Sequence, residues 1–159
     1  MRRFKDNTGR EWTLDLTIGD VKRVQSLIGV NLLDLTSGDP PLCTRLAVDV
    51  MLVCDVAFAL VKPQADRLGV TDEGFGAVLG GEAIGECHRA LIDEITDFFL
   101  RLGRTENAKM MTGARKLTAA AIDLAERKID AIDMDSILAS IAGESSTSLP
   151  ESSASIPTP

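Results

Sequence analysis

The chain has 159 residues, of which 45% are hydrophobic but only 4% aromatic, and its formal net charge is -7. That length suits one domain, and a core with so few aromatic residues must be built from aliphatic side chains, which is typical of helix-on-helix packing. An acidic surface repels phosphate, so the composition argues against general binding to nucleic acid or to an anionic membrane surface.

The first segment, about residues 3–16, has the pattern of a β-hairpin. Trp12, Leu14 and Leu16 alternate with polar residues, as in a strand with one buried face. The turn that precedes them ends at Gly9, which tolerates the positive φ of a tight turn. A lone hairpin is marginal in water, so we expect it to pack on helices or to pair with another chain.

Helical patterns fill the chain from residue 17 to residue 142. Thr17 and Asp20 have the spacing of a capping box at the start of the first helix, and Gly29 ends that helix. The later segments predicted to be helical are a short turn at 31–35, a long segment at 42–62, a short helix at 71–79, and helices at 82–102, 105–132 and 135–142.

The segment 42–62 is almost wholly apolar, and its Val-rich middle also fits a strand. Its length without helix breakers favours a central, largely buried helix. Arg45 and Asp49 are four residues apart on this helix and can pair. We expect Pro63 to end or kink the helix, with a separate turn at 64–68.

The segment 82–102 has the cleanest amphipathic pattern. Asp97 and Arg101 lie on its polar face with the acid-first spacing that favours an ion pair. Its apolar stripe is formed by Ile84, Cys87, Leu91, Ile95, Phe98 and Leu102.

Residues 143–159 are rich in Ser, Thr and Pro, contain half of the chain's six prolines, and hold no Lys, Arg or aromatic residue. Such a stretch has too little apolar surface to offset the roughly 1–2 kcal/mol per residue that ordering costs. We therefore predict a mainly α protein: a small helical bundle at 1–142 with an N-terminal β-hairpin, followed by a disordered tail or linker at 143–159.

No residue pattern favours catalysis or metal binding, and we expect no catalytic, cofactor-binding or metal-binding residue. His88 is the only histidine, and no G-x-S-x-G elbow accompanies it. The neighbours Cys87 and His88 lack the paired ligands of a zinc site. The three cysteines lie in apolar runs, as buried thiols of a reducing cytoplasm do. A small hydrolase or metal enzyme would have to depend on His88.

The remaining hypothesis is that the chain binds another protein. Flexible Met side chains and small Ala side chains on a helix suit a groove that accepts an apolar helix of a partner, although each such residue is also explained as core. The candidate partner-binding residues are Met110, Met111, Phe98, Phe99 and Trp12.

Several short segments, together with the Ser/Pro tail, carry a resemblance to a known family. These segments are 4–12, 18–24, 31–35, 54–55, 62–65 and 97–99. The layout as a whole resembles the tail assembly chaperones of long-tailed phages and prophages, over essentially the whole chain. The motifs concern the fold, so the resemblance transfers no site residue.

The resemblance implies a protein of the host cytoplasm that binds the tape measure protein, keeps it soluble and assists assembly of the tail tube without being retained in the virion. A frameshifted extension beyond the tail would recruit the tail tube protein, and the chaperone could also form a homo-oligomer. The alternative is a structural virion component, such as a head–tail connector or a tail-associated protein. Neither function involves nucleic acid, a membrane or a cofactor.

Overall fold

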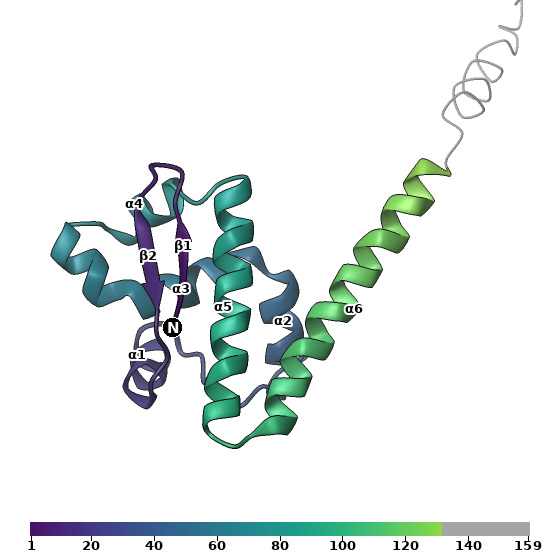
Figure 1. Cartoon of the computed structure of the whole chain (residues 1–159), viewed down its shortest axis with the longest axis horizontal. Coiled ribbons are helices and arrows are strands. Elements are labelled where there is room, and N and C mark those ends of the chain that lie inside the picture. The colour runs from purple at the N-terminus through teal and green to yellow at the C-terminus, as the bar shows by residue number, and fades with distance from the viewer. Residues whose placement is uncertain (132–159) are drawn as a thin grey trace, which may run out of the picture. The chain divides into compact units, whose positions relative to one another are not determined.

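The computed structural model describes residues 1–131, which are mainly helical and begin with a two-stranded antiparallel hairpin (Figure 1). The predicted fold class is therefore confirmed. The chain divides into two units, Met1–Ala120 and Ala121–Pro159, and of the second only residues 121–131 are described. The helix predicted at 135–142 and the tail predicted at 143–159 lie outside the described residues.

The hairpin forms where the alternating pattern predicts it, with strands β1 (Arg2–Lys5) and β2 (Glu11–Leu14). Phe4 lies opposite Trp12, and both side chains are buried. The turn closes around Asp6, whose Oδ1 accepts hydrogen bonds from the backbone N–H (2.9 Å) and the hydroxyl (2.6 Å) of Thr8. Gly9 has φ 81°, as the predicted turn requires.

Six helices follow within the described residues: α1 (Ile18–Ile28), α2 (Leu42–Val48), α3 (Val50–Leu68), α4 (Asp72–Ala77), α5 (Glu82–Arg101) and α6 (Thr105–Asp130). The capping box predicted for the first helix is confirmed, because Thr17 and Asp20 exchange the two expected side-chain bonds. Gly29 ends α1 in the left-handed conformation, with φ 72°. A turn forms within the predicted segment 31–35, where the Asp34 N–H donates to the Asn31 carbonyl oxygen at 3.1 Å, but the segment is not helical, and it buries Leu32 and Leu35.

The single helix predicted at 42–62 is also wrong, because Asp49 divides it into α2 and α3. Asp49 leaves the helical region, and its side chain accepts a hydrogen bond from the backbone N–H of Leu52 at 3.1 Å. This is N-cap geometry, which satisfies one of the free N–H groups at a helix start. The carboxylate of Asp49 therefore caps α3, and its predicted ion pair with Arg45 does not form.

Pro63 does not end α3, which continues to Leu68 and is capped by Gly69. Proline removes the N–H that would bond the carbonyl four residues earlier, here that of Ala59. Arg23 on α1 replaces this donor, since its Nε lies 2.8 Å from the Ala59 oxygen. The predicted break and the separate turn at 64–68 are wrong because a side chain distant in sequence supplies the missing hydrogen bond.

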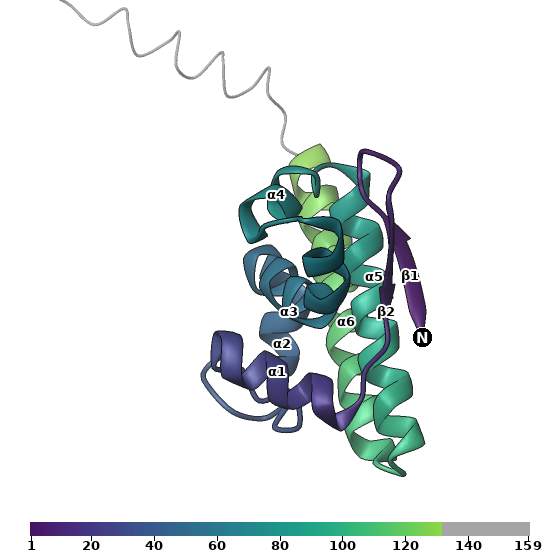
Figure 2. The same ribbon diagram turned by 90° about the vertical axis from the view of Figure 1, so that its left-hand side faces the viewer.

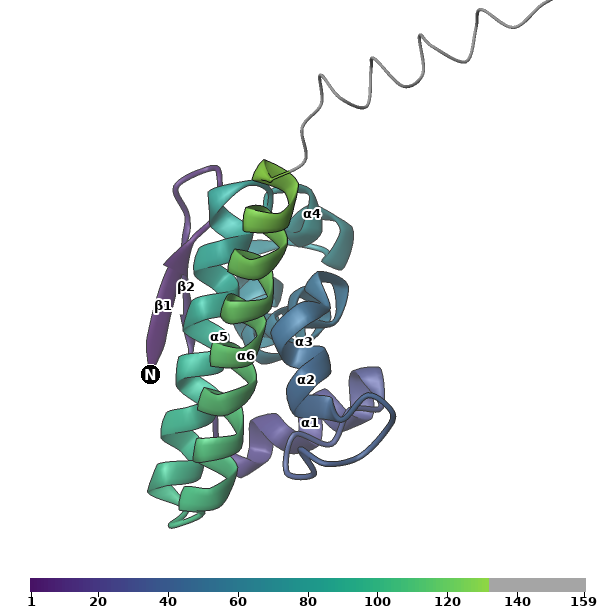
Figure 3. The same ribbon diagram turned by 90° about the vertical axis from the view of Figure 1, so that its right-hand side faces the viewer.

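Helix α3 lies at the centre of the first unit and contacts β2, α1, α2, α4 and α5. The hairpin packs against α5 on one side, as Figures 1 and 3 show. Figure 2 shows the molecule from the side opposite to Figure 3, with α1 below α3 and the hairpin beside α5. The core between these elements is mostly aliphatic, with Trp12, Phe75 and Phe99 as its largest fully buried side chains.

Helix α6 contributes only Ala108 and Met111 to the buried residues. In the second unit, the described residues are the last ten of α6 and Ala131, and all of them are exposed. They include the large apolar side chains of Ile122, Leu124 and Ile129, which are 54%, 55% and 65% exposed.

Candidate functional site: a groove between the last two helices

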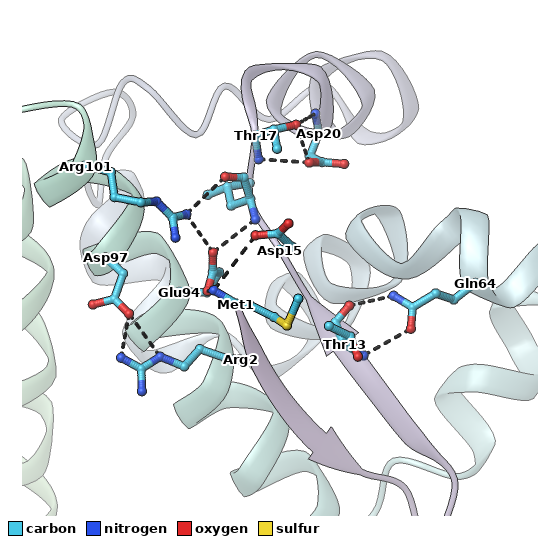
Figure 4. A network of polar contacts seen from close by, with 11 residues as sticks. Met1, Arg2, Thr13, Asp15, Thr17, Asp20, Gln64, Glu94, Asp97 and Arg101 are labelled. Atoms are coloured by element: carbon cyan, nitrogen blue, oxygen red, sulfur yellow. Dashed lines mark hydrogen bonds and ion pairs between the residues drawn. The ribbon is translucent and has the colours of Figure 1, made fainter.

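A polar network in the first unit centres on Glu94 of α5 and has a structural role (Figure 4). Glu94 is fully buried, and its Oε1 accepts from the Leu16 backbone N–H at 3.1 Å and from Arg101 at 2.9 Å. Its Oε2 lies 2.7 Å from the α-amino nitrogen of Met1, the only partner of that oxygen among the described residues. Burial opposes ionisation, but these donors outweigh it and hold the pKa of Glu94 below its ordinary value.

Two further contacts tie the hairpin to the helices. Arg2 pairs with Asp97 of α5 at 2.5 Å. Gln64 of α3 pairs with both backbone groups of Thr13, accepting at 3.1 Å and donating at 2.6 Å. The side-chain amide thus covers the outer edge of β2, which would otherwise present unpaired backbone groups. Figure 4 shows these contacts converging on the strands from two helices.

Trp12, a predicted partner-binding residue, belongs to an aromatic cluster in the core. Its ring meets that of Phe75 edge to face at 5.1 Å between centroids, and Phe75 also contacts Phe4 and Phe58. The indole Nε1 donates to Asp6 Oδ2 at 2.9 Å. Burial opposes ionisation of Asp6, yet hydrogen bonds from Thr8 and Trp12 hold its pKa below the ordinary value. Trp12 therefore anchors the hairpin.

The other predicted partner-binding residues lie around the end of α5 and the start of α6. Phe98 and Phe99 contact each other at 5.6 Å between centroids, and both are buried. Met111 is 1% exposed, whereas Met110 is partly exposed. A buried side chain can touch a partner only if the core opens, so we assign Trp12, Phe98, Phe99 and Met111 to the core.

A groove of about 450 Å³ lies between α5 and α6 in the first unit. Most of its lining surface comes from apolar atoms, although three threonines and two lysines contribute to it, and Leu100 is 51% exposed there. Thr96 and Leu100 come from α5, and the α6 side is formed by Thr105, Ala108, Lys109, Thr112, Gly113 and Lys116. Sequence reasoning missed this groove because periodicity identifies an apolar stripe but not where a neighbouring helix stops covering it.

Two other surfaces expose apolar side chains. Val48, Val50 and Met51 are 56%, 55% and 73% exposed at the junction of α2 and α3. A second hollow, of about 170 Å³, includes Leu27 and Phe58. It also contains acidic residues, and its Asp55 has a pKa raised by burial and by the nearby Asp72.

The cysteines and the histidine do not form a catalytic arrangement within residues 1–131. Burial raises the pKa of Cys87 to about 12, so its thiol stays protonated and inert. His88 Nε2 lies 2.8 Å from the Leu46 carbonyl oxygen, which can only accept, so this nitrogen donates its proton there. In the part of the chain that the structure describes, no cluster of acidic, His or Cys side chains is suited to holding a metal ion.

Comparison with known proteins identifies no relative: no family model, curated protein or solved structure matches this chain. Among the helices in residues 1–131, none combines the length and hydropathy needed to cross a bilayer.

Proposed function

We propose that the protein is a tail assembly chaperone that binds apolar helices of the tape measure protein, keeps them soluble and assists assembly of the tail tube. The single observation that supports this function best is the groove between α5 and α6. It has the apolar interior and the open form that a helix-in-groove interaction uses. The family resemblance of the sequence supplies the identity of the partner.

The surface around the groove supports the same role. Leu117 of α6 is 74% exposed, and Leu100 of α5 is 51% exposed. The chain as a whole carries a net charge of -7, which favours solubility while an apolar partner is held. The tail tube protein would be a second partner, recruited through a frameshifted extension that continues from the Ser/Pro tail.

Co-expression with the tape measure protein tests the proposal. The tape measure alone should be insoluble, and co-expression should yield a soluble complex that survives affinity purification and gel filtration. A tape measure that stays insoluble, or a soluble one that does not co-purify, contradicts the function. The matched control is an unrelated acidic helical protein of similar size, expressed at the same level.

The alternative is a structural component of the virion. Mass spectrometry of purified particles separates the two functions, because a connector or tail-associated protein remains in the particle whereas a chaperone leaves. Stoichiometric recovery of this chain from tails would favour the structural role.

A further inference from the structure

Four of the six residues on the α6 side of the groove have small side chains, and the other two are Lys109 and Lys116. Ala108 and Gly113 are the smallest, and Thr105 and Thr112 add only short side chains. Thr112 and Gly113 lie between the two lysines in sequence, and there a second helix can approach the α6 backbone closely. The groove therefore has the shape to accept a helix along α6.

Gly113 is not explained by contacts within the chain. Glycine inside a helix makes the helix less stable than alanine does. It suits positions where the backbone needs a positive φ or where another group approaches closely. Gly113 has no positive φ, and a Cβ added to it would meet no atom of the chain within 4 Å. Gly113 therefore leaves open space at this point of the groove, where a partner helix can approach the α6 backbone closely.

The charges at the groove are basic and unpaired. Lys109 and Lys116 lie two helical turns apart on one edge, both exposed, and neither makes an ion pair among residues 1–131. No acidic side chain lines the groove. The nearby Glu106 lines a separate hollow at the turn between α5 and α6.

Three arginines near α5 differ, because each pairs with an acidic residue of that helix: Arg2 with Asp97, Arg101 with Glu94 and Arg115 with Asp93. On a chain with net charge -7, an unpaired basic edge beside an apolar groove is a local reversal of the general surface. Such a reversal favours a partner of opposite charge and steers its approach.

We propose that this groove binds an amphipathic helix of another protein whose apolar stripe is flanked by Asp or Glu side chains. The carboxylates pair with Lys109 and Lys116, and the apolar stripe covers Leu100 and lies against Gly113. This inference rests on the proposed helix-binding function and specifies the partner's chemistry. A second copy of the chain is a poorer occupant, because two molecules of net charge -7 repel each other.

Two designed peptides test the partner chemistry directly. Each is an amphipathic helix of about twenty residues with the same Leu/Ala stripe. One peptide carries Glu beside the stripe and the other carries Lys. Fluorescence anisotropy against the full chain should show the Glu peptide binding at least about fivefold more tightly at low salt, with the preference shrinking as salt is added. Equal affinities, or no binding of the Glu peptide, would overturn the inference.

Matched variants locate the interaction. Gly113→Leu fills the groove and should weaken binding of the Glu peptide at least about tenfold. Gly85→Leu is the control, since Gly85 is an exposed glycine inside α5 with equally open space around it and lies outside the groove. Lys109→Glu combined with Lys116→Glu should reverse the peptide preference, whereas the same change at the exposed Lys5 and Lys22 should not. Circular dichroism confirms that each variant is folded.

The outcomes separate this inference from the proposed function. If the tape measure protein co-purifies equally with wild type, Gly113→Leu and Gly85→Leu, the chaperone function stands and the groove assignment is wrong. If the tape measure protein does not bind but the Glu peptide binds and responds to the variants, the groove assignment stands and the chaperone function is wrong. Sedimentation that shows a wild-type dimer dissociated by Gly113→Leu would make a second copy the occupant and overturn the inference.

Discussion

Arg23 on α1 supplies the hydrogen bond that Pro63 on α3 cannot make. The Arg23 Nε donates to the Ala59 carbonyl oxygen at 2.8 Å, and its Nη2 donates to the Leu60 oxygen at 3.0 Å. Asp20 pairs with the same guanidinium from within α1. The continuation of α3 beyond its proline therefore depends on a residue far earlier in the chain, and the two helices are coupled through one side chain.

We expect Arg23→Met to lower the free energy of unfolding by about 1–3 kcal/mol, because it leaves a buried carbonyl without a donor. In a Pro63→Ala background the loss should be smaller by about 1 kcal/mol, since the substituted alanine would provide the helical N–H itself. A double-mutant cycle measured by urea unfolding tests this coupling. Additive effects of the two substitutions would show that Arg23 and Pro63 act independently.

The contribution of Glu94 to the free energy of unfolding should decrease as the pH falls. Because the folded-state pKa of Glu94 lies below its ordinary value of 4.5, the contribution is complete above that value and is lost as pH falls through the folded pKa. The difference in unfolding free energy between wild type and Glu94→Gln should therefore be constant from pH 7 to about pH 5 and shrink below about pH 4.5. A difference that stays constant down to pH 3 would contradict this.

Asp49 should act as a helix cap and not as an ion-pair partner. Asp49→Ala removes the bond to the Leu52 N–H and should cost about 1 kcal/mol, whereas Asp49→Asn retains an acceptor and should cost much less. Arg45→Ala provides the comparison, because the ion-pair prediction from sequence would require it to cost as much as Asp49→Ala. Thermal unfolding of the three variants ranks these effects.

Trp12 should report on the core and not on a bound partner. It is the only tryptophan and has no exposed surface. We expect blue-shifted emission with little quenching by iodide, and neither property should change when the tape measure protein or the Glu peptide binds. A change of Trp12 emission on binding, without loss of stability, would show that Trp12 contacts the partner.

The hairpin and the caps were predictable because their causes lie within a few residues. The alternation around Trp12, the left-handed Gly9 and the Thr17 capping box each depend on neighbours in sequence, and all three are confirmed. The amphipathic helix at 82–102 is also confirmed, as α5. Local periodicity carries this information because burial on one side imposes it directly.

The ion pairs and the groove were not predictable in the same way. Asp97 and Arg101 have ideal helical spacing, yet Asp97 binds Arg2 and Arg101 binds Glu94. Glu94 directly precedes Ile95 of the apolar stripe and is fully buried. Spacing shows which charged residues can pair along one helix. Only the packing of the hairpin on α5 brings Arg2 to Asp97 and the Met1 amino group to Glu94.

The sequence by itself determined the class of the protein: an acidic, mainly helical chain with an N-terminal hairpin, because composition, periodicity and caps are local properties. Tertiary structure decided where α3 ends, which carboxylate is buried, and which apolar residues remain exposed. Each of these depends on groups far apart in the chain, as Arg23 is from Pro63 and as Leu100 of α5 is from Gly113 of α6. The apolar stripes were visible in the sequence, but only helix packing could show that one groove stays open.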